Sequence, residues 1–317
     1  MIERYKTLGR SIWLASILSA FFMGLFSCAS DTDLRRPLVV NVFLHGEEAP
    51  GLIRAAEDLM FAARSISGAG DAASSTKTVR VYIRQNDTEF GAQGYRLETV
   101  THGTDVYAGT WLGAMYGLYQ IAGDIGARYI HPEQTIYPSN PWTSIPIYDG
   151  RKPTNPHFEM RGFHEHTQHP TVMSDYLLRP DVDGFRDGVS KYLHWLARNR
   201  QNQLTFHMLN TVDLDAWIPY MQDIVAEAKT YGVKIGFVIG FVDQQQNAFR
   251  LVKPEEIDSE TGRPVSDEVQ ITTKLDRFAS VGVELIGFQI GTSEFTKPDE
   301  DSMLRWLNLA TEHLSIN

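Results

Sequence analysis

The chain has 317 residues, of which 43% are hydrophobic and 21% are charged, as in ordinary globular proteins. This length suffices for two domains with sizeable cores. The formal net charge of -10 and the lack of basic runs argue against a nucleic-acid partner. The only cysteine is Cys28, so the sequence offers no disulfide framework and no cysteine-based zinc site.

Residues 1–28 have the pattern of a bacterial lipoprotein signal peptide. Basic residues precede an apolar run from Ile12 to Phe26, which is too short for a typical spanning helix. Small Ser27 then precedes Cys28, as in a lipobox. The pattern predicts cleavage before Cys28 and a lipid anchor on it, which holds the exported protein in the cell envelope. The alternative is an uncleaved anchor with an incidental cysteine.

Residues 38–133 are predicted to form a small α/β domain. β-branched residues favour a strand at 38–44, and apolar residues at helical spacing favour a helix at 52–66. A glycine- and alanine-rich helix is expected at 112–125, with Gly126 as its left-handed cap. We find no catalytic cluster in this domain. The other predicted strands are 79–84, 94–100 and 105–110.

Residues 134–157 are rich in proline and are predicted to be a connector. From residue 158 the pattern alternates between strand and helix four times. Strands are predicted at 158–166, 203–209, 234–241 and in 285–295, where an apolar run ends in a small-residue turn. Helices are predicted at 185–199, 216–231, 272–281 and 299–314.

Four successive βα units predict a parallel sheet. An open doubly wound sheet is one way to finish it, but no glycine-rich phosphate loop follows the first strand. A (β/α)8 barrel needs roughly 250 residues, and residues 158–317 supply fewer. We therefore expect an α/β protein with a small α+β domain and a TIM-type barrel of which about four βα units are present. Unpaired edges are a liability, so a missing C-terminal half or a partner is expected to complete the barrel.

Catalytic side chains of parallel barrels stand just past the carboxyl ends of the strands. Glu294 follows the fourth predicted strand, so its carboxyl group is a candidate general acid. Phe288 and Phe295 could raise the pKa of that carboxyl. Asp243, at the end of the third strand, is a weak candidate for the second carboxylate. The alternative for Glu294 is a solvated loop residue.

Three histidines are predicted to share the same mouth. His164 and His166 lie two apart on a strand and so face one side of the sheet, and His207 ends the next strand. Their side chains could contact polar groups of a substrate. Two histidines so spaced on the first barrel strand also suit a metal-dependent amidohydrolase, and a structural role is a third possibility. Arg161, beside the strand start, is either a bidentate donor to a substrate or part of a salt bridge.

The order of a small α/β domain, a proline-rich connector and a βα barrel resembles glycoside hydrolase family 20 and the family 67 α-glucuronidases. The resemblance covers roughly residues 38–317. In the first domain it rests on Gly94-Tyr95-Arg96-Leu97, Gly113 to Gln120 and Gly126 to Pro132. In the barrel it rests on Met160-Arg161-Gly162-Phe163, Asn202 to Met208, Tyr231 to Ile235 and Gly291-Thr292-Ser293-Glu294.

The resemblance implies a hydrolase that acts on a glycan without a cofactor or metal, with Glu294 as general acid and Arg161 bound to sugar hydroxyls. Family 20 has an aspartate where this chain has Ser293, and a neutral serine cannot stabilise the positive charge of an acetamido intermediate. That difference favours a glucuronidase-like or other glycosidase, in which Ser293 and Asp243 contact substrate. The alternatives are a non-catalytic carbohydrate-binding surface lipoprotein and the amidohydrolase with His164 and His166.

Overall fold

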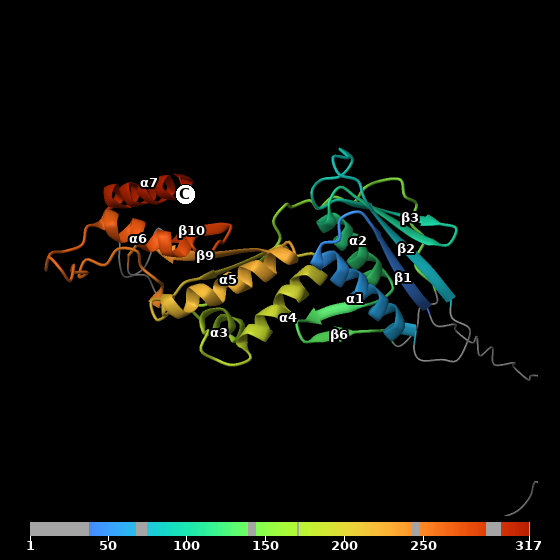
Figure 1. Ribbon diagram of the computed structural model, residues 1–317, viewed down its shortest axis with the longest axis horizontal. Coiled ribbons are helices and arrows are strands. Elements are labelled where there is room, and N and C mark those ends of the chain that lie inside the picture. Colours follow the sequence, from blue (N-terminus) through green and yellow to red (C-terminus); the bar gives the residue numbers. More distant parts are fainter. Residues whose placement is uncertain are drawn as a thin grey trace, which may run out of the picture.

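The structure is a computed structural model that describes residues 38–67, 75–138, 144–169, 171–242, 247–289 and 299–316. These residues form two four-stranded sheets with their own helices, one from each half of the chain, and a two-stranded hairpin (Figure 1). Cys28 lies outside the described residues, so the expected lipid anchor has no structural counterpart. In the described part of the chain, no helix has the length and apolar content that a membrane crossing requires.

The first sheet has the strand order β1-β2-β4-β3 and confirms the predicted α/β unit. Its strands are β1 (Leu38–His45), β2 (Ser75–Ile83), β3 (Tyr95–Val100) and β4 (Gly103–Ala108). Strand β2 lies between β1 and β4 and runs parallel to both, whereas β3 runs antiparallel to β4. Helices α1 (Pro50–Ser67) and α2 (Trp111–Asp124) bury an apolar core with it. Gly126 has a φ of 113°, as the predicted cap requires.

A hairpin that the sequence did not predict follows α2. It consists of β5 (Arg128–His131) and β6 (Gln134–Ile136) and spans the expected start of the connector at residue 134. Its prolines lie at the turn and beyond the last strand, so they interrupt no ladder hydrogen bond. Farther along, the connector forms bridges to β3, from Thr154 to Tyr95 and from Asp149 to Glu98.

The second sheet is parallel, in the order β10-β9-β8-β7, as the alternating pattern predicts. Its strands are β7 (Gly162–Glu165), β8 (Gln203–His207), β9 (Lys234–Gly240) and β10 (Leu285–Gln289). Its predicted helices are α4 (Phe185–Arg198), α5 (Leu214–Thr230), α6 (Asp267–Ala279) and α7 (Glu300–Ile316). A short helix that was not predicted, α3 (Val172–Leu178), precedes α4. The chain is therefore an α/β protein with a partial barrel.

The two faces of the second sheet differ in chemistry. On β8, Leu204 and Phe206 are fully buried and belong to the core that includes Trp217 of α5. The alternate residues Thr205 and His207 point to the opposite face, which is the inner face of the partial barrel. Polar side chains can be presented on this inner face because the helices pack on the other one (Figure 1).

The two units are joined by a buried carboxylate. Asp58 of α1 is only 7% exposed, and it accepts hydrogen bonds from Tyr119, His194 and Arg198 at 2.6–3.0 Å. Burial by itself would raise the pKa of Asp58, but the hydrogen bonds from His194 and Arg198 outweigh it and hold that pKa well below the ordinary value. Since His194 and Arg198 belong to α4, this cluster connects the first domain to the barrel.

Candidate functional site

The candidate site lies on the inner face of the second sheet, at the carboxyl ends of β7 and β8. The structure brings together all three predicted histidines there. The ring of His207 is 4.6 Å from that of His164 and 5.2 Å from that of His166, measured between ring centroids. His164 and His166 thus face the same side, as their spacing predicts.

Short polar contacts fix the orientation of these rings. His164 Nδ1 is 3.0 Å from Thr205 Oγ1, and His164 Nε2 is 3.0 Å from His207 Nδ1. His166 Nδ1 is 2.9 Å from Nδ1 of His169, on which it stacks. Thr205 therefore belongs to the site although the sequence reasoning missed it. The alternation Gln203-Leu204-Thr205-Phe206-His207 could have identified it, because Thr205 and His207 share one face of β8.

Electrostatics keeps the central pair neutral. Burial, together with the nearby rings of His164 and His166, lowers the pKa of His207 to about 4. Burial and the adjacent His166 also lower the pKa of His164, against a smaller opposing effect of Glu165. A neutral imidazole offers one donor and one acceptor. Because the shared contact uses Nδ1 of His207, its Nε2 is left to bind a hydroxyl group of a ligand.

A metal ion does not fit the histidines as they stand. Among the described residues, no three or more His, Cys, Asp or Glu side chains are placed to hold one. The short nitrogen–nitrogen contacts explain this, since His164 and His207 direct nitrogens at each other instead of at a common point. The amidohydrolase alternative therefore gains no support from the described part of the site.

Arg161 is not at the mouth, contrary to the expectation that it faces the histidines. It lies directly before β7, at the opposite end of the strand. Its guanidinium donates to the backbone carbonyl of Arg200 at 2.9 and 3.1 Å and to that of Phe158 at 2.6 Å. The physical reason is that Arg161 precedes the first residue of β7, whereas the mouth lies at the carboxyl ends of the strands.

The two carboxylates of the hypothesis, Glu294 and Asp243, lie outside the described residues, and so does Ser293. The described strand β10 ends at Gln289, after which Glu294 follows in sequence. Oε1 of Gln289 is buried and has no hydrogen-bond partner among the described residues. The roles of Glu294, Ser293 and Asp243 thus stay predictions.

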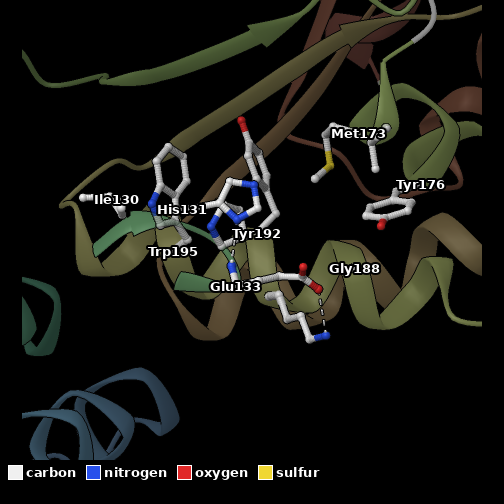
Figure 2. Close-up of a pocket in the computed structure, with 11 residues that line it drawn as sticks. Ile130, His131, Glu133, Met173, Tyr176, Gly188, Tyr192 and Trp195 are labelled. Carbon is white, nitrogen blue, oxygen red and sulfur yellow. Dashed lines mark hydrogen bonds and ion pairs between the residues drawn. The ribbon is translucent and has the colours of Figure 1, made fainter. Parts of the chain in front are cut away.

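A separate cavity of about 510 Å³ lies on the outer side of the sheet, among α3, α4 and the β5–β6 hairpin (Figure 2). Trp195, Tyr192 and Tyr176 give it an aromatic wall. Its polar groups already have partners: Lys191 pairs with Glu133 at 3.2 Å, and the Tyr192 hydroxyl donates to Glu165 at 2.6 Å. It is an apolar groove beside the edge strand β7, distinct from the histidine site.

Comparison with solved structures relates this fold to glycoside hydrolases. A GH115 4-O-methyl-α-glucuronidase with specificity for decorated arabinogalactans superposes with a TM-score of 0.60 at 13% identity, over 88% of this chain and 40% of that one. A GH138 enzyme that targets pectin rhamnogalacturonan II superposes with a TM-score of 0.52 at 12% identity, over 87% of this chain and 34% of that one. The GH20 β-N-acetylhexosaminidase from Streptomyces coelicolor superposes with a TM-score of 0.52 at 12% identity, over 87% of this chain and 60% of that one.

At these identities the likeness shows the fold alone. The chain has a glycoside hydrolase-like fold, and it spans between about a third and three fifths of the length of these structures. No protein-family model matches the sequence, and no curated protein sequence matches it either.

Proposed function

We propose that this chain carries one half of the active site of a glycoside hydrolase that acts on an extracellular glycan. The observation that carries the proposal is the shared two-part architecture: three classes of glycosidase superpose over 87–88% of the chain, through both the small domain and the βα units. The polar inner face of β7 and β8 supports it, because this is the face on which barrel enzymes bind their substrates.

In the proposed mechanism, Glu294 is the general acid. Its carboxylic acid protonates the glycosidic oxygen as the bond to the anomeric carbon breaks, and the departing sugar leaves as an alcohol. A second carboxylate either attacks the anomeric carbon or activates a water. Asp243 is the candidate for it within this sequence. The neutral imidazoles of His164 and His207 hold sugar hydroxyls, which positions the ring for the transfer.

The test is hydrolysis of a panel of aryl glycosides, glucuronides included, by the natural protein with Glu294→Gln as the variant. The amide keeps the shape but cannot donate the proton, so kcat on poor leaving groups is expected to fall by about 100-fold to 10,000-fold. Glu300→Gln, at the exposed start of α7, is the matched control and should retain full activity. Equal rates for Glu294→Gln and the natural protein would remove Glu294 as the acid.

A non-catalytic carbohydrate-binding protein is the second candidate. The neutral Ser293 beside the proposed acid Glu294 favours it. Binding of a glycan to the immobilised protein without release of reducing sugar would select this function over hydrolysis.

We further propose that the protein is exported and held in the cell envelope by a lipid on Cys28. The basic start, the apolar run and the Ser27-Cys28 pair support this proposal. Labelling of cells with a radioactive fatty acid should mark the natural protein and not the Cys28→Ala variant. Labelling of both would place the lipid elsewhere.

We also propose that further strands complete the barrel, from a longer form of the chain or from a partner. In the described part of the chain, β7 ends the sheet and leaves Phe163 42% exposed, with its ring 5.5 Å from that of Trp195 in the wall of the apolar groove. A further strand would cover the open edge of β7, and a helix in that groove would cover Phe163. Slow amide hydrogen exchange along β7 in this chain alone would contradict an uncovered edge.

A further inference from the structure

A second polar pocket lies where the first domain meets the barrel, at the end of the sheet opposite to the histidines. It has a volume of about 350 Å³. Tyr95 of β3 and Tyr116 of α2 come from the first domain, and Arg161 and Arg200 come from the segments directly before β7 and β8. Phe158 lies at its wall with 68% of its surface exposed.

Two positive charges in this pocket have no negative partner. Within the described ranges, neither Arg161 nor Arg200 forms an ion pair with a carboxylate. The Arg161 guanidinium donates to backbone carbonyls and lies over the Tyr116 ring, and Nη1 of Arg200 donates to the neutral Gln120 and, at 3.3 Å, to the Tyr95 hydroxyl. Nε and Nη2 of Arg200 make no hydrogen bond in the described structure, so donors stay available for a ligand.

A buried hydroxyl is also left without a partner. Tyr116 is 1% exposed, and its hydroxyl group forms no hydrogen bond with the residues that the structure describes. Such a group costs free energy unless something binds it. Burial raises the pKa of Tyr116 to about 12, and the nearby Arg161 opposes that rise only in part, so the hydroxyl stays a neutral donor. The Arg161 guanidinium lies 5.5 Å from the centre of this ring, so the hydroxyl and the cations belong to one site.

The end of α4 places the Arg200 side chain in this pocket. The φ of 58° at Arg200 is the left-handed cap of that helix, in which Arg200 N–H donates to the carbonyl of Ala197 and Gln201 N–H donates to that of Leu196. In this position Arg200 offers its carbonyl to Arg161 and its side chain to the pocket.

We propose that this pocket is an accessory binding site for a small carboxylate of monosaccharide size, such as a uronic acid. Arg200 and Arg161 would pair with the carboxylate, and the Tyr116 hydroxyl would donate to the same ligand. The volume favours a ring-bearing acid over a bare phosphate, which would leave most of the space between Tyr95 and Phe158 to water. Since the chain carries a net charge of -10, local contacts and not a general attraction must hold the anion.

The test is isothermal titration calorimetry of the full chain with D-glucuronate, D-glucose and inorganic phosphate. Saturable binding of glucuronate, with neither glucose nor phosphate bound as tightly, is the expected result. Arg200→Asn removes the charge with a residue that tolerates a positive φ. It should weaken glucuronate binding by about tenfold or more, the loss typical of a hydrogen-bonded charge. Arg151→Asn, an exposed arginine on the connector, is the matched control and should bind as the natural chain does.

Tyr116→Phe separates a ligand donor from a merely unsatisfied hydroxyl. A lower affinity for glucuronate with an unchanged circular dichroism spectrum supports the site. A higher melting temperature with unchanged affinity overturns the role of Tyr116. Absence of glucuronate binding, equal binding of glucose, tighter binding of phosphate or an unaffected Arg200→Asn variant each overturns the proposal.

Discussion

At the scale of single residues, one contact sets the charge of the candidate site. His164 and His207 approach to 3.0 Å through ring nitrogens, so one ring must donate and the other accept. Burial is the main reason why the pKa values of both rings are lowered, and repulsion from a neighbouring protonated ring adds to it, from His166 for His164 and from His164 and His166 for His207. The pair is therefore suited to binding neutral hydroxyls, and it is a poor proton donor at neutral pH.

The lowered pKa of His207 predicts how the stability of the protein depends on pH. The pKa of His207 is about 4 in the folded chain against an ordinary 6.5, so the unfolded chain takes up the proton first. The contribution of His207 to stability is complete above pH 6.5 and is lost as the pH falls toward 4. His207→Gln should therefore flatten the fall in melting temperature over this range, measured by differential scanning fluorimetry. His102→Gln, in the β3–β4 turn, is the control; an identical pH profile for both variants would contradict the assignment.

The sequence predicted the histidine part of the site well and its arginine poorly. His164, His166 and His207 are simple to place, because strand spacing alone puts them on one face. Arg161 was assigned to the mouth through a local motif, although a residue at the start of a strand lies away from the carboxyl ends that form the mouth. Its partners, the carbonyls of Arg200 and Phe158, depend on tertiary contacts that no local pattern reveals.

At the scale of elements, close packing of α2 on the sheet explains the glycine-rich motif of the first domain. A Cβ on Gly113 of α2 would lie 2.2 Å from the carbonyl oxygen of Gly94, and one on Gly117 would lie 2.7 Å from Cγ1 of Val106. The helix thus packs directly on β3 and β4. The glycine-rich run that resembles glycosidases is in this chain a packing motif, and it carries no catalytic group.

Gly113→Ala is expected to lower the free energy of unfolding by about 1–3 kcal/mol, because the backbone of Gly94 cannot move away as a side chain can. Gly123→Ala on the same helix is the control, since no atom lies within 4 Å of its added Cβ. It should be neutral or stabilising by up to about 1 kcal/mol. Urea denaturation measures both, and equal stability of the two variants would show that α2 can retreat from the sheet.

Long, periodic elements were predicted and short ones were missed. α4 and α5 match within a few residues, since an apolar face at helical spacing persists over their length. The seven-residue α3 and the β5–β6 hairpin carry too few residues for a period to show. The predicted first barrel strand, 158–166, is only Gly162–Glu165, because pairing with β8 and not composition sets its length.

At the scale of the whole molecule, Asp58 decides whether the two units behave as one. Asp58→Ala would leave Arg198 partly buried without its carboxylate, and removal of one partner of a buried pair costs about 3–5 kcal/mol. We expect a loss of that order in urea, with the two units unfolding in separate steps. Glu57→Ala, whose exposed pair with Arg54 contributes little, is the control. A single unchanged transition in Asp58→Ala would show that other contacts hold the junction.

The order of the predicted elements was enough to predict the architecture of the whole molecule. It did not predict the Asp58 cluster that joins the two units. Alternating strands and helices predicted a parallel sheet and a partial barrel. Nothing in the local sequence of α1 or α4 links Asp58 with His194, because residues so far apart meet only once both units have formed.

The separation between Asp58 and Arg198 has a consequence for synthesis on the ribosome. The two residues are 140 positions apart, so at about 5–20 residues per second the carboxylate waits about 7–28 s for its partner. During that interval α1 presents an acidic residue on the surface that α4 later covers. The first domain is therefore expected to settle into its final form only after α4 has emerged, which makes the junction the last step of its maturation.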